Sequence, residues 1–145
     1  MSESGLLVEV VSPDQLELST TVDSIVIPAS LGEMEVLPGH IPLLTMAKPG
    51  VLVVRRDGED HHYAISAGFV EVLPDRVTVL VDAAEDEDEI DIERAKAALM
   101  RAEDRLASVE TQDVEQRFAF ESALERARAR IAVWQHRQQH SDHDD

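Results

Sequence analysis

The sequence contains no cysteine, so disulfides, thiol nucleophiles and thiolate metal sites are all excluded. No apolar run approaches the roughly 20 residues that are needed to span a bilayer. The acidic N-terminus also lacks the basic start of a signal peptide. We therefore expect no direct insertion into lipid and, by default, a location in the cytoplasm.

Positive charge is scarce as well. Thirteen Lys and Arg residues face 30 Asp and Glu residues, which gives a formal net charge of −17. The field of such a chain repels phosphate backbones and anionic lipid headgroups. Nucleic acid is therefore excluded as an expected partner, and most single carboxylates are expected to form solvated surface.

Glycine and proline are missing from the second half of the chain. All six glycines lie at or before Gly68, and all six prolines lie at or before Pro74. The 145 residues suit one compact domain with an appendage. The distribution of these breakers predicts two architectures in succession.

The first part is typical of β-structure. Short segments rich in β-branched residues are separated by turns such as "RDGED" and "LPD", and several of them alternate apolar with polar residues. This pattern predicts an antiparallel sandwich or a flattened barrel. Gly68 inside a strand pattern indicates a bulge or a close backbone approach. The expected strands are 6–12, 22–28, 51–56, 61–66, 68–73 and 76–81.

The second part predicts a helical hairpin. Apolar residues recur at steps of three and four, and "SVETQDVEQ" holds the turn between the two helices. The stripes are rich in alanine, so they bury little area and the hairpin is free to dock elsewhere. The first stripe is Ile92, Ala95, Leu99, Ala102, Leu106 and Val109, and the second is Phe120, Leu124, Ala127, Ile131 and Trp134.

An acidic segment, "EDEDEID" at 85–91, joins the two parts. Its carboxylates repel one another and suit the N-terminus of the following helix. They predict an extended hinge rather than a metal site, because adjacent acids in an extended chain do not converge on one cation.

The segment "GEMEVLPGHIPLLT", residues 32–45, is dense in turn residues that break regular elements. With "KPGVLVV", "SAGFVEVLPDRVTVLVDAA" and "IDIERAKAAL", it resembles the epsilon subunit of bacterial F-type ATP synthase, called delta in mitochondria. The likeness is collinear from about residue 6 to 134. Glu35 and Val36 stand where the family usually has a glycine and an apolar residue, and Ala67 stands where a Gly-Gly pair is common.

The resemblance implies a β-sandwich of about ten strands at 1–84, an acidic linker at 85–90, a regulatory two-helix antiparallel hairpin at 91–138 and a disordered tail at 139–145. It also implies a non-catalytic rotor subunit in the central stalk, on the cytoplasmic face of the cell membrane. The implied partners are the gamma subunit, the ring of c subunits, and the beta and alpha subunits in an inhibited state.

The same resemblance gives a role to the segment 32–45. Glu33, Met34 and His40 are expected to contact the c-ring, held by a proline-stiffened backbone. Leu37, Leu43 and Leu44 are expected to anchor the loop in the sandwich. A histidine that only caps its own turn is the alternative for His40.

The hairpin carries two further hypotheses. "IDIERA" and the Arg-Ala-x-x-Arg at 126–130 resemble a nucleotide motif, which implies ATP as a regulatory ligand although no cofactor is required. Asp91 as a helix N-cap is the alternative. Arg126, Arg128 and Arg130 are also expected to meet an acidic loop of beta and so inhibit ATP hydrolysis, with Arg128 on the opposite face from the other two. The expected nucleotide residues are Ile90, Asp91, Arg94, Arg126 and Arg130.

Other patterns are weaker. His136 and His140, with His143 beyond, have a metal-ligand spacing but lie in a polar terminus that is expected to fray, so no metal site is predicted. His61 and His62 are expected to be exposed. No nucleophile signature or phosphate loop is present, and an enzyme is not predicted. The alternative function is a stand-alone acidic β-domain with a nucleotide-sensing helical hairpin.

Overall fold

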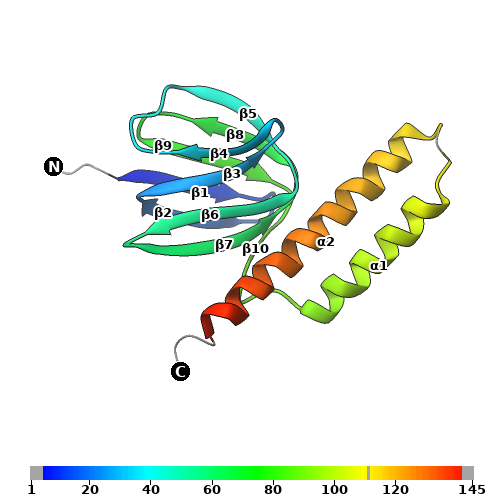
Figure 1. The fold of residues 1–145 in the computed structure, drawn as a ribbon. Coiled ribbons are helices and arrows are strands. Elements are labelled where there is room, and N and C mark those ends of the chain that lie inside the picture. The colour runs from blue at the N-terminus through cyan, green and yellow to red at the C-terminus, as the bar shows by residue number, and fades with distance from the viewer. Residues whose placement is uncertain (1–4, 111, 142–145) are drawn as a thin grey trace.

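The structure is a computed structural model that describes residues 5–110 and 112–141. Ten strands are followed by two helices (Figure 1). The elements are β1 (Leu6–Val11), β2 (Leu16–Val22), β3 (Ser24–Ala29), β4 (Gly32–Val36), β5 (Leu43–Ala47), β6 (Gly50–Arg56), β7 (Glu59–Ile65), β8 (Gly68–Val72), β9 (Arg76–Val81), β10 (Ala84–Asp86), α1 (Ile92–Ser108) and α2 (Val114–Ser141).

The strands form one continuous sheet folded into two layers, which confirms the predicted sandwich. Hydrogen bonding follows the order β10-β7-β6-β3-β5-β8-β9-β1-β2, and β4 also pairs with β3. The layers meet where β3 contacts β5 through the single pair Ala29 and Ala47, because β6 pairs with residues 24–26 on the same edge of β3 and β4 occupies the other edge. Most pairs are antiparallel, as expected, but β1 runs parallel to β9.

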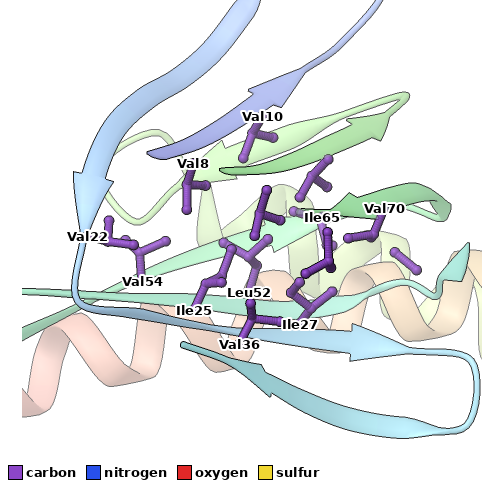
Figure 2. Packing of buried hydrophobic residues seen from close by; sticks show 14 of the residues in the cluster. Val8, Val10, Val22, Ile25, Ile27, Val36, Leu52, Val54, Ile65 and Val70 are labelled. Carbon is purple, nitrogen blue, oxygen red and sulfur yellow. The ribbon is translucent and has the colours of Figure 1, made fainter. Parts of the chain in front are cut away.

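Alternating side chains of both layers fill the space between them (Figure 2). In β1, for example, Leu6, Val8 and Val10 are buried while the residues between them are half exposed. Burying a side chain of this size stabilises the fold by about 1.5–3 kcal/mol. The sandwich therefore has a complete core of its own.

Gly68 marks a close backbone approach, one of the two possibilities that the sequence left open. A Cβ atom at this position would overlap the carbonyl oxygen of Leu80 on the paired strand β9. Glycine is needed here for space, since no side chain fits between the two backbones.

The two helices begin where local side chains cap them. The Asp91 carboxylate accepts a hydrogen bond from the Arg94 amide at 3.2 Å, and the Asp113 carboxylate does the same for Gln116 at 3.0 Å. Both aspartates thus satisfy amide groups that a helix leaves unpaired in its first turn. The predicted turn lies between α1 and α2, as expected.

Helix α2 lies between the sandwich and α1, so it has two buried sides (Figure 1). Ala127, on the predicted stripe, is 1% exposed. Ala129 and Val133 are also buried, in a cluster with Ala64 of β7 and Ile90. The sequence prediction missed this second side, because three-and-four spacing describes one stripe only.

Three local predictions differ from the structure. Residues 32–36 and 43–45 lie in β4 and β5, so only 37–42 form the loop. The acidic segment is not an extended hinge: it contributes to β10 and then turns, with the Asp86 carboxylate accepting the Asp88 amide at 2.9 Å. Residues 139–141 of the predicted tail belong to α2, and 142–145 lie outside the described residues.

We predict that Gly68→Ala lowers the free energy of unfolding by about 1–3 kcal/mol, because the new methyl group forces β8 and β9 apart. Urea denaturation followed by circular dichroism measures the change. Ala67→Ser, at the exposed neighbouring position, is the control and should be near neutral. Equal stability of the two variants would contradict the close approach.

Candidate functional site

The outer face of the layer formed by β5, β8, β9 and β1 carries an uncovered apolar row. Met46 pairs with Phe69, Phe69 with Leu80, and Leu80 with Val11, so the four side chains lie side by side across four strands. Met46, Phe69 and Leu80 are 52%, 55% and 50% exposed. They border a shallow hollow of about 540 Å³ that also includes Pro13.

We name Val11, Met46, Phe69 and Leu80 the apolar row. The sequence prediction did not find it, although the signal is present: "RVTVLV" continues apolar residues onto both faces of β9, so its two faces cannot both be solvated. A contiguous exposed apolar surface rimmed by polar residues is typical of a protein-protein contact.

The loop 37–42 connects β4 of one layer to β5 of the other and is held at its tip. Gly39 has φ +88° and its amide donates to the Pro74 carbonyl at 2.7 Å, which ties the loop to the β8–β9 turn. The His40 ring Nδ1 lies 2.7 Å from the Ile41 carbonyl oxygen, and the His40 amide donates to the Leu37 carbonyl at 3.2 Å. His40 therefore does stabilise its own turn.

Leu37, Leu43 and Leu44 do not anchor the loop as the sequence predicted. They are 56%, 39% and 72% exposed, and none belongs to the core cluster. Leu44 pairs with Glu71 on the outer face of β5, and the last buried residue before the loop is Val36 of β4. Their anchoring is an implication of the family resemblance, and apolar character alone does not say which face of a strand a residue occupies.

The predicted ring-contact residues lie on and just beyond β4, an edge strand. Glu33 is exposed and Met34, the next residue, packs against the core from the other face of the strand. His40 is half exposed in the loop. The structure thus presents Glu33 and His40 to solvent and turns Met34 inward.

Between α1 and α2 lies a basic cavity of about 190 Å³. Arg126 and Arg130 line it, as their shared face predicted, and Arg101 and Arg105 of α1 join them. No carboxylate lines this cavity among the described residues, so it favours an anion. The sequence prediction missed Arg101 and Arg105, which repeat after Arg94 at steps of seven and four and could have been found by that spacing.

The first predicted nucleotide motif lies elsewhere. Asp91 caps α1, Ile90 is buried in the cluster under α2, and Arg94 is exposed. None of these three lines the cavity. Arg128 faces away from it, as predicted, and lies 3.2 Å from Glu125 on the exposed side of α2.

Two ion pairs hold α2 and the acidic segment together. Arg130 Nε lies 3.0 Å from Glu85, and Arg137 lies 3.1 Å from Asp88. The Arg130 pair is partly buried, with the two side chains 19% and 28% exposed. The same arginine therefore both lines the basic cavity and fastens the hairpin to the sandwich.

The histidine predictions need correction in part. His62 is 8% exposed rather than exposed, because α2 covers its side of β7. His136 and His140 lie within α2 and their rings stack at 4.8 Å between centroids, whereas fraying was expected. His143 lies outside the described residues. Across 5–110 and 112–141, no three His, Asp or Glu side chains are placed to hold a metal ion.

In the described part of the chain, neither helix combines the length and the apolar character needed to cross a bilayer.

Comparisons with known proteins agree with this architecture. Residues 6–87 match the family described as the ATP synthase delta/epsilon chain β-sandwich domain, and residues 88–135 match its long α-helix domain. The ATP synthase epsilon chain of Citrifermentans bemidjiense is 52% identical over 128 residues, covering 88% of this chain and 92% of the relative. That of Nitratidesulfovibrio vulgaris is 44% identical over 131 residues, covering 90% and 96%.

Solved structures give the same result. A chain in the structure of the OSCP/F1/c-ring part of the Euglena gracilis mitochondrial ATP synthase matches with a TM-score of 0.75 and 29% identity, covering 90% of this chain and 81% of that chain. A chain of the Tetrahymena thermophila central stalk and c-ring shares the fold, with a TM-score of 0.59 and 14% identity over 89% of this chain and 96% of that chain. The two domain matches, in order and over nearly the whole length, show that this chain belongs to the ATP synthase delta/epsilon family.

Proposed function

We propose that this chain is a non-catalytic rotor subunit in the central stalk of a proton-translocating F-type ATP synthase, peripheral to the cytoplasmic face of the membrane. It couples the catalytic head to the c-ring and restrains ATP hydrolysis through its hairpin. The observation that carries the proposal is the apolar row, an open docking surface on a highly charged chain of this family.

The apolar row suits the gamma subunit as its partner. Three of its side chains are about half exposed and lie in register on a rigid sheet, so a partner can bury them without reordering the backbone. Helix α2 covers the outer face of β6 and β7. The outer face of the opposite layer, which carries the apolar row, is left free. The sandwich can therefore hold gamma whichever position the hairpin takes.

The loop 37–42 and β4 suit the c-ring. The Gly39 to Pro74 hydrogen bond fixes the loop against a second turn, and a stiff contact transmits torque with little loss in elastic deformation. Glu33 and His40 offer polar side chains to the polar loops of the ring, in line with the role implied by the sequence.

The arginines of α2 suit a brake on hydrolysis. In the docked hairpin Arg130 is held by Glu85, and Arg126 lies in the basic cavity. An extended hairpin would release both toward an acidic loop of the beta subunit. ATP bound in the basic cavity would hold them in the docked state instead, a population shift set by its differential affinity.

The first test concerns the apolar row. Phe69→Glu should weaken binding of the gamma subunit at least tenfold, because a charge at the centre of the row is desolvated on docking. Phe118→Glu is the matched control, since Phe118 is also exposed, at 68%, but lies on α2. Co-purification and titration with gamma measure both variants, with circular dichroism to verify the fold. Equal binding by the two would refute the proposed surface.

The second test concerns the loop. Gly39→Val should reduce ATP-driven proton pumping relative to hydrolysis, because a β-branched residue resists φ +88° at a cost of roughly 1–2 kcal/mol. Gly39→Asn is the control at the same position, since asparagine tolerates this conformation. Pumping by membrane vesicles that contain each variant gives the result. Unchanged coupling in the valine variant would remove the loop from torque transmission.

The third test separates the two uses of the arginines. Arg126→Ala with Arg130→Ala should abolish ATP binding, because each lost charged contact costs about 1.5–3 kcal/mol. Arg128→Ala should spare ATP binding, since Arg128 lies outside the cavity, and should relieve inhibition. ATP titration of the isolated subunit and hydrolysis by the reconstituted complex at two salt concentrations supply the data. Wild-type inhibition in every variant would exclude the basic helix as the brake.

A further inference from the structure

Three histidines form a stack where α2 meets the sandwich. His62 projects from the outer face of β7, and its ring centroid lies 3.7 Å from that of His136, at an interplanar angle of 30°. His140 continues the stack one helical turn further, at 4.8 Å from His136. We name these residues the histidine stack, because they join a strand and a helix that are distant in sequence.

The surroundings of His62 do not stabilise a second proton on its ring. Its side chain is 8% exposed, and its Nδ1 atom has no hydrogen-bond partner among the described residues. A neutral imidazole can leave one nitrogen as an unused acceptor, whereas an imidazolium carries two N–H donors. Protonation would therefore bury an unpaired charged donor beside another imidazole ring.

Every element packed around the stack contributes charged or titratable groups to its surroundings. They are Arg55 on β6, Glu59, Asp60 and His61 on β7, Glu87 and Asp88 before α1, and Arg137 on α2.

Two of these carboxylates are already paired. Arg55 lies 2.9 Å from Asp60 and holds the pKa of that carboxyl below its usual value, and Arg137 pairs with Asp88. Glu59 and Glu87 line the open hollow beside His136 and His140, and His62 does not line that hollow. The buried end of the stack thus has little compensation for a positive charge.

We propose that the histidine stack is a proton-sensitive latch, which holds α2 on the sandwich when the His62 ring is neutral and releases it when His62 is protonated. A second copy of the chain or a metal is not needed for this, because both halves of the latch belong to one chain.

The direction of the pH dependence follows from His62. Burial, and next the neighbouring His136, lower the pKa of His62 in the docked state against the opposing effect of Asp60. When α2 leaves, His62 is exposed and its pKa returns to about 6.5. The docked state binds fewer protons, so docking is strongest above about pH 6.5 and weakens as the pH falls below it.

The size of the effect is bounded by linkage. His62 takes up one proton on release, so it changes the docking equilibrium by at most about tenfold per pH unit. A released hairpin would be available to the extended, inhibitory position, and that consequence alone rests on the proposed function. The latch itself is a property of the isolated chain.

Trp134, the only tryptophan of the chain, reports docking directly because it packs against the cluster of Ala129 and Val133. Between pH 8 and pH 5 its emission maximum should shift to longer wavelength, with the midpoint below about pH 6.5. Amide exchange of residues 129–136, compared with that of β8 and β9, should speed up over the same range. The emission maximum is used because a nearby imidazolium quenches intensity by itself.

His62→Gln and His136→Gln should each reduce the dependence of docking on pH by several-fold, because the buried proton acceptor or its neighbour is gone. His61→Gln, one position along β7, is the matched control and should titrate like wild type. The circular dichroism of the sheet verifies folding at every pH.

An unchanged emission maximum and exchange in wild type would overturn the latch, as would a full shift in both glutamine variants. The titration is repeated with EDTA and with added Zn²⁺. A pH response that needs the metal would also overturn it, by making the site a metal clasp. None of these outcomes depends on ATP synthase activity, so failure of the latch and failure of the proposed function are separable.

Discussion

The two sheet layers bury one set of alternating side chains between them, and this packing places every other surface of the protein. With Val8, Val10 and their neighbours inside, the intervening residues must face outward. On β6 and β7 the outward face is covered by α2, while on β5, β8 and β9 it carries Met46, Phe69 and Leu80 uncovered. A slip of one residue in any strand would exchange core and docking surface. The functional surfaces are thus by-products of the core register.

The position of the hairpin depends on its contact with the sandwich, whereas the sandwich is held by a core of its own. Its contact with the sandwich combines an apolar cluster around Ala129 and Val133 with two ion pairs, Arg130 with Glu85 and Arg137 with Asp88. The proposed extended state requires both ion pairs to break. The same arginine, Arg130, lines the basic cavity. One side chain therefore belongs both to the basic cavity and to the contact of α2 with the sheet.

The sequence predicted the sandwich, the hairpin and its turn because alternation and breaker residues are local signals. The close backbone approach at Gly68 was one of two predicted possibilities, because a glycine inside a strand pattern is also a local signal. The apolar row was not found, since Phe69 and Leu80 look like core residues until the register shows their face. Arg101 and Arg105 were missed because they lie outside the predicted motif at the start of α1. Arg94, which lies within that motif, is exposed in the structure. His62 was expected to be exposed, and only the position of α2 over β7 explains its burial.

The apolar cluster beneath α2 has a thermal consequence. The heat capacity change of an association scales with the apolar area that it buries. Ile90, Val133 and Trp134 contribute such area where α2 meets the sheet, so detachment of the hairpin would raise the heat capacity of the chain. The enthalpy of docking would then vary with temperature, and a van't Hoff plot of the docking equilibrium would be curved.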